Sequence, residues 1–195
     1  IELPKVIFVH GFITVNSQKM SKSLGNIVDP FELVKKYGTD SVRYYFLREI
    51  SPTEDGDFTY EKFEQRYNGD LAGGIGNLVS RTVALAIKLN VSQIKATSEI
   101  NKAVDAAKKA RQKYLEDFKF NEALKSIWEL IGFCDKHINE GKPWEAKKNA
   151  NQIVSDSLFV LKNIADLLAP FLPGTSEKIK QLIEQKKPEA LFPRI

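Results

Sequence analysis

The sequence predicts a mainly α-helical protein, in which a helical bundle follows a short strand remnant and a set of small helices. Between residues 71 and 185, apolar side chains recur at the spacing of a single helix face. Short apolar runs typical of buried strands are confined to the first part of the chain. The 195 residues are 43% hydrophobic and 28% charged, which is ordinary for a globular protein with a buried core.

Two apolar runs near the N-terminus predict strands. Residues 6–9 (Val-Ile-Phe-Val) are typical of a strand in a buried sheet, and residues 12–15 form a second strand-like piece after Gly11. One or two such strands do not make a stable sheet alone. We therefore expect the other strands of the sheet to lie upstream, so that the chain is a fragment of a longer protein.

Short helices are expected next. Asp29 followed by Pro30 predicts a helix start, with aspartate as the N-cap and proline in the first turn, and Gly38 should end that helix. Thr39 is expected to cap a second helix. Residues 51–58 are rich in Pro, Gly and Asp, so they predict a loop before a third short helix.

Longer helices make up the rest of the chain. A cluster of four glycines predicts a kink or break near Gly69, because glycine relaxes the backbone. The last long helix is apolar nearly all round, which indicates a position inside the bundle, and Pro170 and Pro173 should end it. A final amphipathic helix and an extended tail are expected after it. The segments expected to form the four longer helices are 71–89, 100–114, 120–138 and 153–168.

Charge and composition exclude few functions. The formal net charge of +4 permits an acidic partner such as RNA but does not require one. The sequence has no uninterrupted apolar stretch of the length that spans a membrane, and its N-terminus lacks the pattern of a signal peptide. Cys134 is the single cysteine, so neither an internal disulfide nor a cysteine-rich metal site is expected. A reducing, cytoplasmic setting is therefore expected.

A lysine-rich loop follows the predicted strands. It reads Lys19-Met20-Ser21-Lys22-Ser23. Two lysines three residues apart, interleaved with two serines, can place ammonium groups and hydroxyls around phosphate oxygens. The alternative for such a pattern is a solvated basic loop without a ligand.

The longer run from residue 19 to residue 26, followed by Asp29-Pro30, resembles the KMSKS signature of class I aminoacyl-tRNA synthetases. The flanks narrow the resemblance to the Met, Ile, Val, Leu and Cys enzymes of that class. Further segments look like the pattern of the methionyl-tRNA synthetases, and the resemblance covers essentially the whole chain. These segments are His10-Gly11-Phe12, Tyr37-Gly38 with Asp40 and Arg43-Tyr44, Asp55-Gly56-Asp57-Phe58, Gly76 to Arg81, Pro143-Trp144, and Leu191 to Ile195.

The resemblance implies a division of the chain into three parts. Residues 1–28 would be the end of a catalytic domain with the lysine loop, residues 29–66 stem-contact linker helices, and residues 67–195 an α-helical anticodon-binding domain. The parent protein would be a methionine–tRNA ligase of protein biosynthesis. The upstream nucleotide-binding fold with its HIGH motif is not in this sequence, so we expect the chain alone to be inactive.

The resemblance also implies roles in ATP binding for the five loop residues. Lys22 would meet the negative charge that develops on the leaving pyrophosphate, with Lys19 assisting. Ser21 and Ser23 would donate hydrogen bonds to phosphate oxygens or shape the loop, and Met20 would anchor it. ATP is expected to act with Mg²⁺ in the full enzyme, and no metal site is expected in this segment.

A second set of residues would recognise the tRNA. Asn77 and Arg81 are four apart on the polar side of a predicted helix, and Lys88 falls on the same side. This pattern is usually a solvated face, but the resemblance implies hydrogen bonds to bases of the anticodon loop. Trp144, at an expected helix start, would stack on an anticodon base, although an isolated tryptophan is more often core. Trp128 is interpreted as packing.

Other polar residues receive structural or open roles. Asp40 and Arg43 match a motif of the same family, and we interpret them as an internal ion pair that fixes helix packing. His10 either lines the active site or is structural. The roles of Asp55 and Asp57 are open, with metal binding as one alternative.

Three classes of function remain in competition. The first is a portion of a methionine–tRNA ligase, whose partners are methionine-specific tRNA and, together with the missing catalytic domain, ATP and methionine. The others are a stand-alone tRNA-binding helical module without catalysis and a structural bundle. The lysine loop favours the first, because a pure binding module has no need of it. Within the ligases, the isoleucine and valine enzymes are the alternative. No membrane partner is expected.

Overall fold

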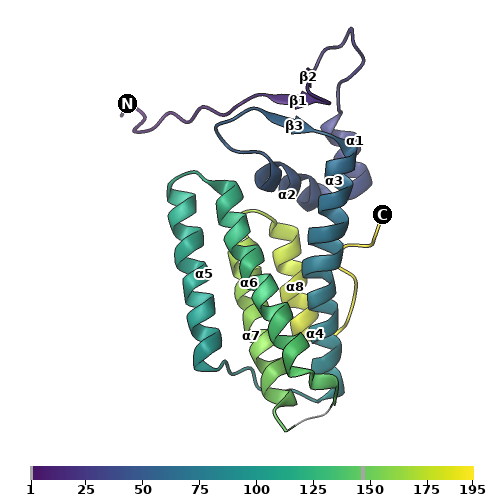
Figure 1. Cartoon of the computed structure of the whole chain (residues 1–195), viewed down its shortest axis with the longest axis vertical. Helices are drawn as coiled ribbons and strands as arrows, with labels where there is room; N and C mark the ends of the chain where they lie inside the picture. The colour runs from purple at the N-terminus through teal and green to yellow at the C-terminus, as the bar shows by residue number, and fades with distance from the viewer. Residues whose placement is uncertain (1, 146–147) are drawn as a thin grey trace.

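A computed structural model describes residues 2–145 and 148–195, and it is mainly helical, as the sequence predicts. Figure 1 shows a small sheet above a set of long helices that run roughly side by side. The helical elements are α1 (Pro30–Tyr37), α2 (Thr39–Glu49), α3 (Tyr60–Arg66), the π-helix η1 (Tyr67–Gly76), α4 (Asn77–Lys88), α5 (Ser98–Glu116), α6 (Phe120–Gly141), the 3₁₀ turn η2 (Pro143–Glu145), α7 (Ala150–Leu168) and α8 (Pro173–Gln185).

The sheet has three short strands in the described chain. Strand β1 (Ile13–Val15) lies in the middle, antiparallel to β2 (Gln18–Lys19) and parallel to β3 (Gly56–Phe58). The strand expected at residues 12–15 is thus confirmed. The prediction of a loop over residues 51–58 is wrong for its last three residues, which form β3. The pairing of β3 with β1 joins segments far apart in sequence, so a local pattern does not reveal it.

The strand expected at residues 6–9 is wrong for this chain. These residues form no strand in the described structure, and Val6, Ile7 and Val9 are 63%, 80% and 75% exposed. A strand needs a neighbour to bond and a layer to bury its apolar side chains. Figure 1 shows this segment running outward from the sheet toward the N-terminus, without a neighbouring strand in the described chain, and of its apolar side chains Phe8 packs against Phe118 and Phe120.

The short helices begin and end largely as the sequence predicts. The carboxylate of Asp29 accepts a hydrogen bond of 2.8 Å from the backbone N–H of Phe31, and Pro30 is the first residue of α1. Gly38 follows α1 with a φ of 84°, a conformation that favours glycine. Thr39 does not cap α2, because Gly38 holds that position and Thr39 is the first helical residue.

No break occurs at the glycine cluster. Helices α3 and α4 are joined without interruption by η1, so of the kink or break expected near Gly69 the break is wrong, and the helix changes to a π-helix there instead. In this wider helix, a Cβ added at Gly73 would lie 2.9 Å from the carbonyl oxygen of Asn68, and one at Gly76 would lie 2.9 Å from that of Leu71. Glycine therefore permits the π-helical backbone instead of ending the helix.

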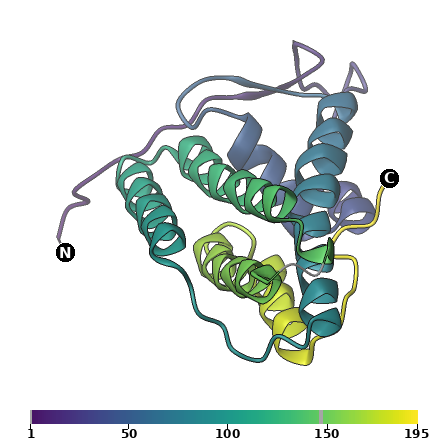
Figure 2. The same cartoon turned by 60° about the horizontal axis from the view of Figure 1, so that its bottom comes forward.

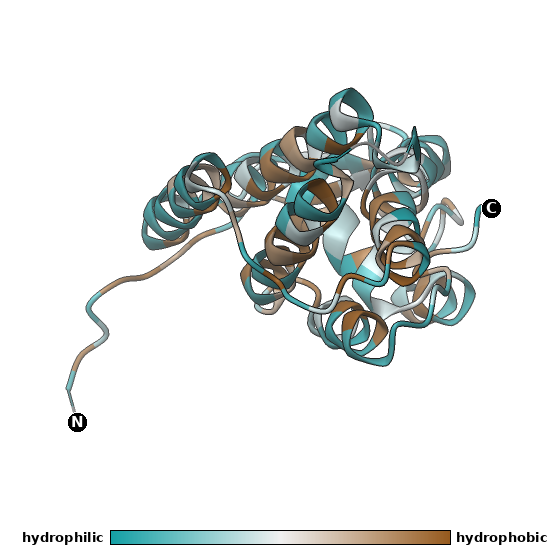
Figure 3. Cartoon of the chain, turned by 90° about the horizontal axis from the view of Figure 1, so that it is seen from below, coloured by the Kyte–Doolittle hydropathy of each residue, from teal (hydrophilic) through white to brown (hydrophobic). Residues whose placement is uncertain are grey.

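The core lies mainly among α4, α6, α7 and α8, and it continues into α5, η1 and α2. Figure 2 shows the long helices grouped together, and Figure 3 shows that many hydrophobic residues of the helices face the interior of the bundle. The apolar stripe predicted on α6 is buried, from Leu124 through Ile131 to Ile138. Helix α7 is buried on nearly all sides, as expected. Pro173 does not end α7 but lies at the first turn of α8.

No helix of the described residues is long and apolar enough to cross a membrane.

Two polar residues tie the short helices to the bundle. The carboxylate of Asp40 accepts hydrogen bonds from the backbone N–H and the hydroxyl of Thr175, at the start of α8. The guanidinium of Arg43 donates to the carbonyl oxygens of Phe171 and Pro170, at 2.6 and 3.0 Å. The internal ion pair expected between Asp40 and Arg43 is therefore wrong: each binds free backbone groups at the turn between α7 and α8. Their role in helix packing remains.

Candidate functional site

The lysine loop extends from a tight hairpin. Strands β1 and β2 are joined by Asn16 and Ser17, whose φ angles of 52° and 60° lie in the left-handed region. Lys19 is the last residue of β2 and pairs with Thr14. Figure 1 shows the chain after β2 rising above the rest of the molecule. Lys19 and Lys22 are both exposed, so their ammonium groups are free to meet an anion.

Asn26 closes the lysine loop. Its side-chain oxygen accepts a hydrogen bond of 2.8 Å from the N–H of Ser21, and its amide nitrogen donates to the carbonyl oxygen of Lys19 at 3.1 Å. The hydroxyls of Ser21 and Ser23 lie 2.8 Å apart and bond each other. The side chain of Asn26, at the end of the loop, is therefore hydrogen-bonded to the start of the loop at Lys19 and Ser21. Lys22 lies on the exposed segment between these two points.

Asp57 supports the hairpin from which the loop extends. One oxygen of its carboxylate accepts hydrogen bonds from the N–H of Ser17 at 2.6 Å and the hydroxyl of Thr14 at 2.8 Å. These bonds to Ser17 and Thr14 lower the pKa of the Asp57 carboxyl below its ordinary value. Asp55 accepts a hydrogen bond of 2.7 Å from the N–H of Phe12. Both carboxylates thus accept hydrogen bonds from β1 or from residues directly before and after it. Among the described residues, no group of three or more His, Cys, Asp or Glu side chains is placed to hold a metal.

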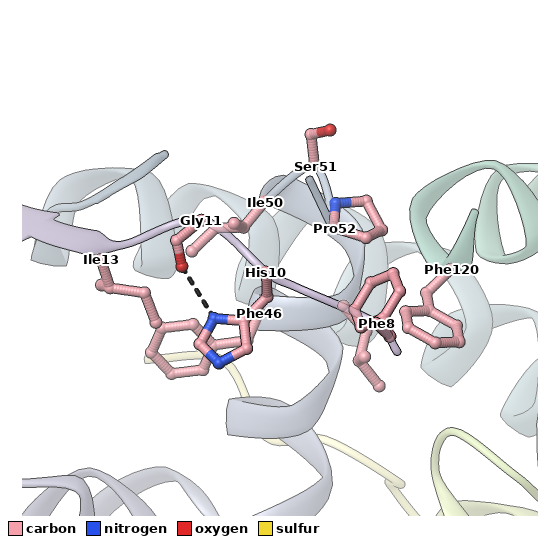
Figure 4. A pocket seen from close by; sticks show the side chains of 10 residues that line it. Phe8, His10, Gly11, Ile13, Phe46, Ile50, Ser51, Pro52 and Phe120 are labelled. Atoms are coloured by element: carbon pink, nitrogen blue, oxygen red, sulfur yellow. Dashed lines mark hydrogen bonds between the residues drawn. The ribbon is translucent and has the colours of Figure 1, made fainter. Parts of the chain in front are cut away.

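His10 lies in a pocket separate from the lysine loop. The pocket has a volume of about 250 Å³ and lies where the N-terminal segment passes α2 and the start of α6. Figure 4 shows the imidazole of His10 turned back toward the carbonyl oxygen of Gly11, which lies 2.8 Å from Nδ1. The surrounding side chains are mostly apolar. The lining residues are Phe8, His10, Gly11, Ile13, Phe46, Leu47, Ile50, Ser51, Pro52 and Phe120.

A larger groove lies between η1 and α4 on one side and α6 on the other. Its volume is about 500 Å³, and we call it the α4–α6 groove. The groove is lined by polar side chains and by several glycines. Because glycine has no side chain, the backbone at those positions is accessible from the groove. The lining residues are Gly69, Asp70, Gly73, Gly74, Asn77, Arg81, Trp128, Ile131, Gly132, Asp135 and Asn139.

Asn77 and Arg81 meet in this groove. Asn77 is exposed, whereas its neighbours Leu78 and Val79 are fully buried, so the core holds the backbone that presents the amide. The guanidinium of Arg81 donates to Asp135 at 2.6 Å and to Asn139 at 2.8 Å, both on α6. These bonds fix the planar fork of the arginine across the two helices.

Trp144 and Lys88 lie outside the described lining of the groove. Trp144 is 43% exposed, in the 3₁₀ turn that directly follows α6, and Asn139 belongs to the last turn of α6. Lys88 is exposed at the end of α4. The structure thus brings Asn77 and Arg81 together in one groove, and it does not bring Trp144 or Lys88 into the lining of that groove. Trp128 is partly buried and packs against Tyr44, with ring centroids 4.4 Å apart and the ring planes tilted by 31°.

Sequence reasoning missed several side chains of these two regions. Asp135 and Asn139 hold Arg81, and they bond each other at 2.9 Å as an i, i+4 pair on α6. That spacing, beside the buried stripe of the same helix, was a usable signal. Asn26 lies inside the quoted lysine motif, yet its spacing alone does not reveal that its amide reaches back to Lys19 and Ser21.

Comparison with known proteins assigns the class. Residues 1–83 match the family model described as tRNA synthetases class I (M), and residues 95–193 match the one described as the anticodon-binding domain of tRNA ligase. The second match covers more than half of the chain. The chain therefore belongs to the family of the anticodon-binding domain of tRNA ligases.

Within that class, the similar proteins are methionine–tRNA ligases. The chain is 37% identical to the enzyme of Thermotoga maritima, over 95% of this chain and 32% of the relative, and 43% identical to that of Clostridium acetobutylicum, over 91% and 30%. A solved structure, Mycobacterium tuberculosis methionyl-tRNA synthetase in complex with methionyl-adenylate, matches with a TM-score of 0.84 and 31% identity, over 93% of this chain and 39% of that one. The resemblance to methionyl-tRNA synthetases is confirmed. The chain spans about a third of the length of the curated relatives.

Proposed function

We propose that this chain is part of a methionine–tRNA ligase, which uses ATP to attach methionine to its tRNA. Residues 1–28 contribute the lysine loop to the ATP site, residues 29–66 link it to the bundle, and residues 67–195 recognise the anticodon. The observation that carries the proposal is the pairing of two separate polar regions in one chain: an exposed lysine loop above the sheet and a polar groove beside α6.

The lysine loop acts in the first step of the reaction. A carboxylate oxygen of methionine attacks the α-phosphorus of ATP, the bond to the β-phosphate oxygen breaks, and pyrophosphate leaves with the electron pair. Lys22 meets the charge that grows on the pyrophosphate, and Lys19 assists. The hydroxyls of Ser21 and Ser23, which now bond each other, are close enough to turn toward phosphate oxygens together. Met20 is 37% exposed, and in this proposal it anchors the loop.

Mg²⁺ arrives with the nucleotide in this proposal. It is a hard cation that prefers phosphate oxygens and usually keeps several of its waters. The positive charge that the protein itself contributes against the phosphates comes from the two loop lysines, Lys19 and Lys22. The setting proposed for the enzyme is the cytoplasm. Cys134 is a buried free thiol, and burial raises its pKa to about 12.

The α4–α6 groove and its surroundings read the anticodon loop. The amide of Asn77 offers both a donor and an acceptor to a base edge, and the fork of Arg81 can bond a base or stack on it. The exposed ring of Trp144 offers a stacking platform for an unpaired base. Lys88 supplies a cation for the phosphate backbone. The half-exposed carboxylate of Asp135 beside Arg81 adds an acceptor, which favours a base edge that presents a donor.

A gel-shift series with the chain itself tests the proposal against its alternatives. Methionine tRNA should be retarded at a lower protein concentration than tRNAs for other amino acids. Equal retardation of all tRNAs would favour a stand-alone RNA-binding module, and no retardation would favour a structural bundle. Preference for isoleucine or valine tRNA would assign the chain to those enzymes instead.

Formation of methionyl-adenylate should need the rest of the enzyme. The pockets for adenine and for methionine are expected in the two thirds of the relatives that this chain does not match. We expect no pyrophosphate exchange by the chain alone, in a preparation free of host enzyme. Restored exchange is expected in a chimaera, in which the chain replaces the matching segment of the Bacillus subtilis methionine–tRNA ligase, to which it is 41% identical.

A further inference from the structure

We propose that Asp57 is a positioning residue for the lysine loop: its carboxylate holds the turn between β1 and β2 in the conformation that aims Lys19 and Lys22 at the nucleotide. The inference rests on the proposed function of the loop. It adds a residue that acts through the hairpin and lies on a distant part of the chain, in β3.

The turn between β1 and β2 needs outside support. A two-residue hairpin turn of this kind places both residues in the left-handed region, where Asn-Gly is the favoured sequence. Here the residues are Asn16 and Ser17, with φ angles of 52° and 60°. Serine pays a steric penalty there because its Cβ crowds the backbone. The turn is therefore weakly specified by its own sequence.

Asp57 supplies this support through a single oxygen atom. It accepts the N–H of Ser17 at 2.6 Å, inside the turn, and the hydroxyl of Thr14 at 2.8 Å. Thr14 is the residue that pairs with Lys19 across the hairpin. One carboxylate thus fixes the turn and also the strand position opposite the first lysine of the loop. The N–H of Asn16 adds a bond of 3.3 Å to the carbonyl oxygen of Phe58.

The position of the loop follows from the position of the hairpin. The loop begins directly after Lys19, and its other fastening, Asn26, is itself bonded to the carbonyl oxygen of Lys19. If the turn relaxes, Lys19 shifts, and the segment that carries Lys22 shifts with it. A misplacement of about 1 Å in a group that meets the transition state can cost on the order of 10²-fold in rate.

Asp55 provides a matched control. It is the other aspartate of the segment Asp55-Gly56-Asp57-Phe58, and its carboxylate accepts one backbone hydrogen bond, from the N–H of Phe12 at 2.7 Å. Phe12 precedes β1, so this bond fastens the entry to the sheet and not the turn. Loss of Asp55 should therefore disturb the loop less than loss of Asp57.

The test uses the chimaera with the Bacillus subtilis enzyme and single-turnover formation of methionyl-adenylate. Asp57→Ala should slow adenylation by about 10- to 100-fold, with methionine affinity unchanged. Asp57→Asn keeps an acceptor oxygen at the same place and should stay within about threefold of the unsubstituted chimaera. Ser17→Gly gives the favoured Asn-Gly turn, so adding it to Asp57→Ala should recover most of the rate. Asp55→Ala should cost less than Asp57→Ala.

Hydrogen exchange on the 195-residue chain gives an independent readout. The amide of Ser17 should exchange faster in Asp57→Ala, and amides in α6 and α7 should be unchanged, which also shows that the variant is folded. The inference is overturned if Asp57→Ala adenylates at the normal rate while Lys22→Ala is slow, or if Ser17→Gly recovers nothing. If Lys22→Ala is also normal, the proposed function of the loop is wrong instead.

Discussion

The lysine loop and the α4–α6 groove are held in different ways. The loop is exposed, and the amide of Asn26 and the hairpin below it are its fastenings in the described structure. The groove residues stand on helices whose inner faces are buried: Leu78 and Val79, beside Asn77, have no exposed surface. The segment that carries Lys22 can therefore change shape at small cost above a hairpin that Asp57 holds in place, whereas the groove presents its polar groups already in place.

Because the two regions are held differently, we expect the lysine loop to affect the rate of adenylation and the α4–α6 groove to affect the binding of tRNA. A mobile cation is useful when it strengthens its contact in the transition state, so its loss should lower the rate more than the affinity. A rigid polar face is useful when it binds the ground state without a cost of ordering. Substitutions in the two regions should therefore change different measured quantities.

The largest effect is expected for Lys22→Ala in the chimaera. Loss of one charge-assisted contact to the leaving pyrophosphate costs about 2–4 kcal/mol, or roughly 10²–10³ in the rate of adenylation. Single-turnover kinetics would measure this, and methionine affinity should change little. Lys35→Ala, which removes an exposed lysine of α1, is the matched control. A rate for Lys22→Ala within about threefold of the control would show that Lys22 is not the key cation.

The next effect is expected for Trp144→Ala in the chain itself. A base stacked on an aromatic ring is worth about 1–3 kcal/mol, so methionine tRNA should bind at least about tenfold more weakly. Phe118→Ala is a suitable control, because Phe118 is 39% exposed and precedes the opposite end of α6. Unchanged tRNA affinity in a folded Trp144→Ala protein would remove Trp144 from the interface.

A smaller effect is expected for Arg81→Ala. Its donors are already shared with Asp135 and Asn139, so the contribution to base discrimination should lie at the low end for such contacts, about 1 kcal/mol or roughly fivefold. Competition between methionine tRNA and an anticodon variant would measure it. Arg81→Lys keeps the charge but loses the fork, and should lose discrimination as well. Retained discrimination in both variants would contradict a role in base reading.

The smallest functional effect is expected for Asp40→Ala. The carboxylate of Asp40 caps α8 through Thr175, and loss of such a cap lowers the free energy of unfolding by about 1 kcal/mol. Urea denaturation should show this shift, while tRNA affinity stays within about twofold. Asp40→Asn keeps an acceptor and should lose less stability. A large loss of tRNA binding without a loss of stability would place Asp40 in the interface.

The sequence predicts features that depend on neighbouring residues. The cap at Asp29, the end of α1 at Gly38 and the buried stripe of α6 each follow from a local rule of spacing or conformation. The lysine loop is recognised from an uninterrupted run. Asn77 and Arg81 fall on one side of α4 because helix geometry is regular.

The features that the sequence does not predict depend on contacts between residues that are far apart along the chain. Strand β3 exists because residues 56–58 meet β1, and the bonds of Asp57 and Arg43 reach partners far along the chain. The apolar run at residues 6–9 shows the converse: its pattern favours a strand, but a strand forms only where a neighbour is present. Long-range pairing is a property of the fold and not of a short window.

The separation of recognition from catalysis can be measured in one titration. The 195-residue chain is titrated against methionine tRNA and against the same tRNA with its anticodon bases replaced, with Lys22→Ala run in parallel. We expect at least tenfold tighter binding of the unaltered tRNA, because base stacking and base-edge contacts are lost in the other. Lys22→Ala should show the same preference. Equal affinity for the two tRNAs, or a preference that disappears with Lys22, would contradict an anticodon-reading bundle that is independent of the loop.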